Sequence, residues 1–247
     1  MKKLNLLLAA VMLLALLAAC KPAEPVLEDV PVPEGDTFAL RINEDPESLD
    51  NIKTTSGAAE SVMAMTFAER LIYIDEGNVI HGWLAESWTV SDDQTEITFV
   101  LRQGIKFTDG TDFNAAAVKF HFDRILDSKN ASPVKAYYGT LQEAVVIDEY
   151  TAKLVFEAPF AGLWNVLSYA YSGFNSPTAV EKWGDEYGRH PVGTGPFMLR
   201  EWLPGSSLTF VRNPGYVQVR EDAINPGPAL LAQIRFLVIP EDGTAMA

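Results

Sequence analysis

The chain has 247 residues, 48% of them hydrophobic, which is enough for one large domain or two small ones. It carries 19 basic and 33 acidic side chains, so its formal net charge is −14. This acidity argues against nucleic acid as a partner, because phosphates require Lys and Arg, and against electrostatic binding to an anionic membrane surface. We interpret the charge as an aid to solubility.

Residues 1–20 are predicted to be a targeting segment. Lys2 and Lys3 precede an apolar run, 6–19, that is too short for a comfortable transmembrane helix. The run ends in Leu-Ala-Ala-Cys, which looks like a bacterial lipobox, and Cys20 is the only cysteine. We expect a lipoprotein signal peptide, cleavage before Cys20 and a lipid anchor on its thiol. An ordinary signal peptide with a chance cysteine is the alternative.

The segment 21–35 contains four prolines and no hydrophobic period, which predicts a semi-extended tether. Residues 36–43 alternate in polarity and predict a strand. A turn-rich loop follows, and the Ser and Gly at its end lead into a predicted helix over about 58–71.

The most regular stretch of the chain is 84–126. Two short alternating strands, 87–90 and 95–101, are predicted on either side of a polar turn. A third short strand is expected at 105–107, before the Asp-Gly turn. Asn114 is placed to cap a helix of about 13 residues, so this stretch predicts a compact unit of strands and one helix.

The remaining elements follow from alternation, helical spacing and turn residues. We expect hairpins at 71–80 and 145–156, short helices at 162–167 and 177–183, an aromatic strand at 169–174, a hairpin over 197–212 and a final strand at 234–239 that is central in its sheet.

Two motifs in this sequence resemble those of the extracellular solute-binding proteins of family 5, which serve ABC importers for oligopeptides, dipeptides and nickel. The first motif lies within 84–120 and the second within 191–216, in the family's order and spacing, and the resemblance runs from about residue 36 to the end. The first reads LAESW, SDD, FxLRxGxKFxDGxxF and AVKF; the second reads PVGTGPF, EW and RNPxY. Ala116-Ala117 and Val217 depart from the usual residues of the family.

The resemblance implies an α/β (mixed α+β) fold with two lobes, similar to type II periplasmic binding proteins. It implies a first-lobe sheet subdomain over 36–67 and 188–247, and an inserted α+β subdomain over 68–187. The family is about twice as long as this chain, so we expect only the first lobe, the second being absent. The resemblance thus leads us to expect a fragment that folds incompletely and exposes an apolar face.

The same resemblance implies where a ligand would bind. Ser56 and Gly57 are ligand-contact candidates, although a plain helix entry is an equal alternative. An aromatic side chain is expected to project from the small lobe and stack on the ligand, with Tyr138 as first choice and Tyr137 as second; a core tyrosine is the alternative. Tyr171 is a weaker candidate.

The function implied is that of a substrate-binding lipoprotein that captures a peptide-like solute between its lobes and delivers it to an ABC permease. The resemblance also implies a monomer, exported and held by its lipid on the outer side of the bacterial cytoplasmic membrane or in the periplasm. No cofactor is expected, and no Cys or His cluster supports direct metal ligation.

The residues also bear on three other functions. An enzyme is disfavoured because the sequence has no GxSxG, no HExxH and no Cys/His pair, and His81, His121 and His190 stand apart; a pair of catalytic carboxylates is not excluded by spacing. The glycines at 193–195 lack the spacing of a phosphate loop. A sensor or surface protein, or an inactive truncated remnant, remains an alternative to transport.

Overall fold

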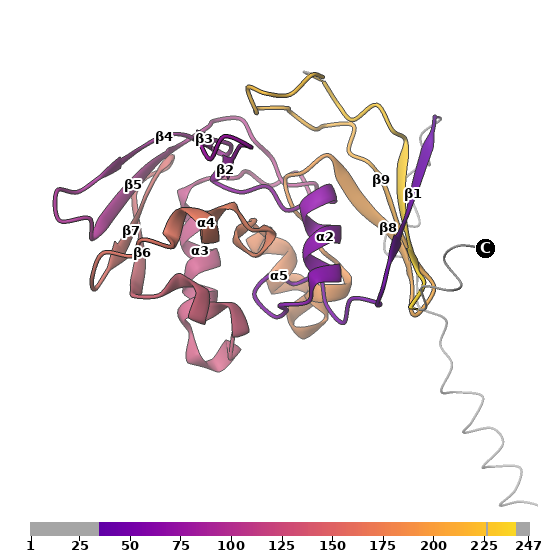
Figure 1. The fold of residues 1–247 in the computed structure, drawn as a ribbon, viewed down its shortest axis with the longest axis horizontal. Helices are drawn as coiled ribbons and strands as arrows, with labels where there is room; N and C mark the ends of the chain where they lie inside the picture. Colours follow the sequence, from indigo (N-terminus) through magenta and orange to yellow (C-terminus); the bar gives the residue numbers. More distant parts are fainter. Residues whose placement is uncertain (1–34, 226, 241–247) are drawn as a thin grey trace, which may run out of the picture.

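The computed structural model describes residues 35–225 and 227–240. The predicted signal peptide, Cys20 and nearly all of the predicted tether lie outside the described residues. Two four-stranded sheets stand at opposite ends of the molecule, and the helices lie between them (Figure 1). The mixed α/β class predicted from the sequence is confirmed.

The first sheet joins the two ends of the described chain. Its order is β1-β10-β9-β8, and β1 pairs in parallel with β10, placing Phe38 opposite Ile234. The final strand is therefore central, as predicted. The β8–β9 hairpin turns at Gly205, whose φ of 68° suits glycine. The strands are β1 (Thr37–Ile42), β8 (Phe197–Leu203), β9 (Ser207–Arg212) and β10 (Gln233–Val238).

The second sheet contains the stretch that the sequence predicts most firmly. Its antiparallel order is β4-β5-β7-β6, and Ile97, Phe99 and Leu101 of β5 are buried together on one face. Helix α3 (Ala115–Leu126) packs against β6 and β7 of this sheet. Its strands are β4 (Ala85–Val90), β5 (Glu96–Leu101), β6 (Leu141–Asp148) and β7 (Thr151–Phe156).

Helix α3 begins where the sequence predicts. The Asn114 side chain accepts hydrogen bonds from the backbone N–H groups of Ala116 (3.0 Å) and Ala117 (3.3 Å), two donors that otherwise lack helical partners. The other regular elements are the hairpin β2 (Ile72–Ile74) with β3 (Ile80–Gly82), and the helices α2 (Gly57–Thr66), α4 (Leu163–Ser168) and α5 (Pro177–Trp183).

Three predicted elements are wrong in type or length. Residues 105–107 form only an isolated bridge between Lys106 and Asp112, and 170–172 form a short 3₁₀ helix instead of an aromatic strand. Helix α2 ends at Thr66 and not near 71, because the Phe67 carbonyl accepts the N–H of Gly195 from a distant loop at 3.1 Å. Packing between segments far apart in the chain overrides the local helical pattern here.

The first sheet falls within the predicted first-lobe subdomain, and the second sheet within the predicted inserted subdomain. The boundaries of that division stay a prediction. Within the residues that the structure describes, no helix is long and apolar enough to cross a membrane.

Candidate solute-binding face

The start of α2 is built around Ser56. Its hydroxyl oxygen accepts the N–H of Ala59 at 3.2 Å, the geometry of a helix cap, and its O–H donates to Glu44 Oε1 at 2.6 Å. Gly57 follows at the first helical position and is exposed, and a Cβ there would meet no atom within 4 Å. The Ser56 hydroxyl is thus already engaged, while the backbone at Gly57 is open to solvent.

Two predicted tyrosines meet beside this helix start. The buried Tyr171 donates its hydroxyl hydrogen to the Ser56 carbonyl oxygen at 3.1 Å. The Tyr137 ring lies 6.2 Å from the Tyr171 ring and is 39% exposed. Burial, assisted by the negative charge of Glu60, raises the pKa of Tyr171 to about 12, so its hydroxyl stays protonated. The structure therefore brings Ser56, Gly57, Tyr137 and Tyr171 together.

Tyr138 does not join them. Its side chain is 1% exposed, packs edge-on to Phe122, and exchanges a 2.6 Å hydrogen bond with the Ser172 hydroxyl. Successive residues of the 3₁₀ helix Pro133–Tyr138 point in different directions, and the Tyr138 side chain points into the core. The expectation that Tyr138 projects from the surface is corrected, and Tyr137 holds the exposed position.

Hollows flank the start of α2 on two sides. One, of 580 Å³, lies between the end of β1 and α2, and its lining includes Asn43, Gly57 and Met65. Another, of 410 Å³, lies against the loop before α2, and its lining includes Lys53, Ser56 and Pro133. Both contain Glu44, so they form neighbouring parts of one surface.

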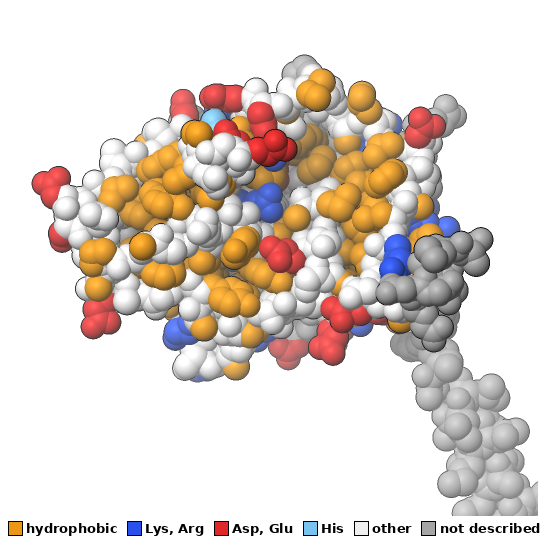
Figure 2. Space-filling view, viewed as in Figure 1, with side chains coloured by type: hydrophobic (Ala, Val, Ile, Leu, Met, Phe, Trp, Pro, Cys, Tyr) orange, Lys and Arg blue, Asp and Glu red, His pale blue; other side chains and the backbone are white. Residues whose placement is uncertain are grey.

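The face that displays α2 also exposes apolar side chains. Figure 2 shows hydrophobic atoms in two groups, separated by a central hollow in which Lys or Arg atoms appear. Exposed large hydrophobic side chains among the described residues include Phe38 on β1, Met65 on α2, Tyr137, Tyr169 just after α4, and Val217, Ile224 and Leu230 between β9 and β10.

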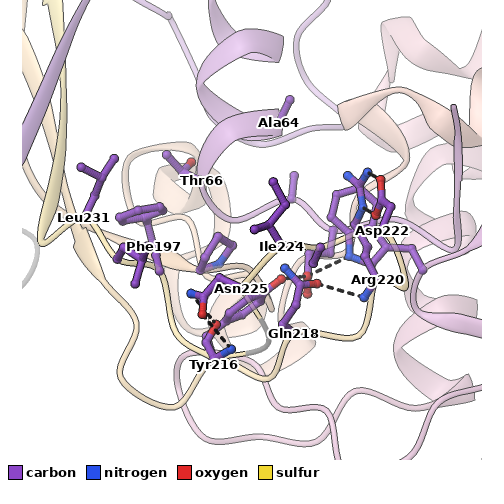
Figure 3. A pocket seen from close by; sticks show the side chains of 18 residues that line it. Ala64, Thr66, Phe197, Tyr216, Gln218, Arg220, Asp222, Ile224, Asn225 and Leu231 are labelled. Atoms are coloured by element: carbon purple, nitrogen blue, oxygen red, sulfur yellow. Dashed lines mark hydrogen bonds and ion pairs between the residues drawn. The ribbon is translucent and has the colours of Figure 1, made fainter. Parts of the chain in front are cut away.

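A third cavity, of 570 Å³, lies at the other end of α2 (Figure 3). Beside it the Glu69 carboxylate is fully buried and accepts three hydrogen bonds, from Trp83 Nε1 (2.9 Å), Thr194 Oγ1 (2.7 Å) and Tyr216 OH (2.8 Å). Burial raises the pKa of Glu69, although these three donors lower it in part. Through these hydrogen bonds Glu69, just after α2, connects to the residue that follows β3, to the 193–196 loop and to the segment after β9.

Arginines surround the same tryptophan. The Arg70 guanidinium carbon lies 4.4 Å from the centre of the Trp83 ring, and that of Arg220 lies 4.8 Å from it. Arg220 also pairs with Asp222, at 2.5 Å. The sequence reasoning missed Glu69, Arg70 and Arg220; only Tyr216 stands in a recognised motif, and isolated Glu and Arg residues give no local signal.

The described residues hold no cluster of three or more His, Cys, Asp or Glu side chains placed for a metal ion. Of the histidines, His121 is buried among Phe122 and Phe174, and burial lowers its pKa to about 3, which keeps the ring neutral. His121 is accordingly a core side chain.

Comparison with known proteins gives a consistent family. The model of the bacterial extracellular solute-binding proteins, family 5 Middle, matches residues 79–247. The glutathione-binding protein GsiB of Shigella flexneri is 36% identical over 233 residues, which are 94% of this chain and 42% of that protein. The chain therefore spans less than half the length of the curated relatives it matches.

Solved structures agree with this fold. The PBP AgaA from A. tumefacien R10, in complex with agropinic acid, aligns with a TM-score of 0.75 and 26% identity, over 85% of this chain and 41% of that one. NikA from Brucella suis, in complex with Fe(III)-EDTA, aligns with a TM-score of 0.72 and 27% identity, over 85% and 41%.

These alignments confirm the predicted fold class, a mixed α/β fold of the type II periplasmic-binding-protein kind, of which this chain supplies a part. The relatives are named for binding and not for catalysis. On the match over residues 79–247 together with the shared fold, the chain belongs to the bacterial extracellular solute-binding proteins, family 5.

Proposed function

We propose that this protein is the substrate-binding component of an ABC importer and that it captures a small peptide-like solute on the face that displays α2. The observation that supports this most directly is the exposed Tyr137 ring beside Tyr171 and Ser56. A half-exposed aromatic ring next to open backbone suits a ligand with both apolar and polar parts.

The class of solute is inferred from relatives. GsiB is named as glutathione-binding, and the AgaA and NikA structures contain agropinic acid and Fe(III)-EDTA. All three ligands are small polar molecules that contain carboxylate. The proposed solute therefore belongs to the short peptides and related amino-acid conjugates, and the protein delivers it to a membrane permease.

Tyr137 provides the test of the proposed binding face. We expect the product of the complete gene to bind glutathione or trialanine in titration calorimetry, and Tyr137→Ala to weaken that binding about tenfold through loss of ring contact. Ile147→Ala, which shortens an exposed apolar side chain on β6, is the matched control and should leave affinity unchanged. Absence of binding to both probes and to a dipeptide panel would refute the peptide-like assignment.

The lipid anchor at Cys20 is also part of the proposal, supported by the lipobox-like sequence before it. Cells grown with labelled palmitate should label the wild-type protein and leave Cys20→Ser unlabelled. In membrane fractionation the variant should move to the soluble fraction, because two or more acyl chains are needed for stable anchoring. Equal labelling of both proteins would contradict lipidation at this residue.

A further inference from the structure

The structure points to a second recognition element, for a charged group. We propose that Arg70, seated on the Trp83 ring beside Arg220, binds a carboxylate of the solute. This inference rests on the proposed function and names a chemical feature of the solute that the protein selects.

Arg70 lacks a partner of its own. Its Nε is buried and has no hydrogen-bond partner among the described residues, and none of the ion pairs found in this part of the chain includes it. A guanidinium has five N–H donors and is costly to desolvate, so a partly buried one without an acceptor is rare in native structures. A ligand that supplies the acceptor explains the arrangement.

The carboxylates near Arg70 are engaged or distant. Glu69, its neighbour in sequence, accepts its three hydrogen bonds from Trp83, Thr194 and Tyr216. Asp222 is held by Arg220 through two hydrogen bonds, of 2.9 and 2.5 Å. Glu60 acts on Arg70 through its charge only. The charges of Glu69 and Glu60 favour the charged form of Arg70, but no carboxylate among the described residues is hydrogen-bonded to it.

A second arginine, Arg220, lies beside Arg70. Arg220 lies 4.0 Å from the centre of the Tyr73 ring and shares the Trp83 ring with Arg70. Burial and, to a lesser degree, the charge of Arg220 lower the pKa of Arg70 to about 10, so Arg70 stays protonated at neutral pH. Arg220 is already paired with Asp222, so a solute carboxylate would pair chiefly with Arg70.

A cavity adjoins Trp83, the ring against which Arg70 packs. Trp83 and Arg220 line the 570 Å³ cavity, with Gln218 and Asn225 contributing amides, as Figure 3 shows. The charge of Glu60 on α2 acts on both Arg70 and Tyr171, so both lie within electrostatic range of that helix. The planar fork of Arg can form two parallel hydrogen bonds to a carboxylate, and contact with an aromatic ring restricts its motion.

Comparing each acid with its neutral derivative measures how much the carboxylate contributes to binding. Titration calorimetry on the product of the complete gene would compare trialanine with trialanine amide, and glutathione with its diethyl ester. We expect Arg70→Gln to weaken binding of the acids by at least about 30-fold and to change binding of the neutral forms by less than about threefold. Arg70→Lys, which keeps the charge and loses the fork, should fall between wild type and Arg70→Gln.

A matched control is Arg235→Gln, which removes an exposed arginine from β10 and should leave all affinities unchanged. Equal affinity of the wild type for acid and neutral probes would overturn the proposal, even if the Arg70 variants do not fold. An equal loss for acids and neutral forms in Arg70→Gln would also overturn it, by showing a purely structural role. If the wild type binds none of the four probes, the proposed function itself fails, and this inference fails with it.

Discussion

At the scale of the residue, Glu69 is a buried group held by several distant partners. Its carboxylate is fully buried and joins three side chains from three separate segments. No other single side chain that we describe links the end of α2 to so many parts of the proposed binding face. Its protonation should therefore be coupled to folding.

Glu69→Gln tests this coupling. Because burial raises the pKa of the folded Glu69 above its ordinary value of 4.5, the fold favours the protonated form. Its contribution to stability is complete below the unfolded pKa and is lost as pH rises through the folded pKa. Urea unfolding from pH 4.5 to 8 should show the wild type losing stability relative to Glu69→Gln as pH rises.

The exposed Glu143 of β6 is the control for that series. Glu143→Gln should differ from wild type by the same small amount at every pH, because the side chain is exposed to solvent. A flat difference for Glu69→Gln as well would show that the folded protein does not shift this group.

At the scale of the element, the boundary of α2 is decided by a glycine loop. The backbone of 193–195 passes so close to the helix end that a Cβ on Gly193 would lie 2.2 Å from the Phe67 carbonyl oxygen. A Cβ on Gly195 would lie 2.5 Å from that of Thr66. These glycines permit close backbone approach, and they position Thr194 to reach Glu69.

Gly193→Ala should therefore destabilise the protein by about 3 kcal/mol or more, measured by chemical denaturation, because backbone must move to admit the methyl group. Gly57→Ala is the matched control: a Cβ there meets nothing, and alanine is the better helix former. That variant should be neutral or more stable by up to about 1 kcal/mol. Similar effects at both sites would contradict the close approach at Gly193.

At the scale of the whole molecule, a buried ion pair joins the loop after β1 to α3. Arg124 donates to both carboxylate oxygens of Asp50, at 3.2 and 2.6 Å, and Asn175 donates to the same carboxylate at 3.3 Å. The two charged side chains are only 12% and 6% exposed. This network connects the loop after β1, a strand of the first sheet, to α3, the helix that packs against the second sheet.

Asp50→Ala should cost about 3 kcal/mol in the free energy of unfolding, because it leaves the Arg124 charge buried without its partner. Adding Arg124→Ala should cost less than the sum of the two single changes, which a double-mutant cycle measures. The exposed pair Lys119–Asp123 on α3 serves as the comparison and should show a coupling of about 0.5 kcal/mol or less. Simple additivity at Asp50 and Arg124 would contradict the proposed role of the pair.

Sequence by itself determined the elements whose causes are local. The alternation in β5, the Asn114 cap of α3 and the span of α5 between Pro177 and the glycine at 184 each depend on neighbours within a few residues, and each is confirmed. The two motifs likewise sufficed for the family, because they preserve residue types in a long fixed order.

Only the tertiary structure decided which candidate side chains reach the surface and what they meet. Tyr137 and Tyr138 are adjacent and alike in chemistry, and core packing buries one and exposes the other. Arg70, Trp83 and Arg220 are separated by up to 150 positions in the chain and come together through the turns that enclose Glu69. Such a site leaves no local pattern in the sequence, because its residues come into contact and become buried only when the chain folds.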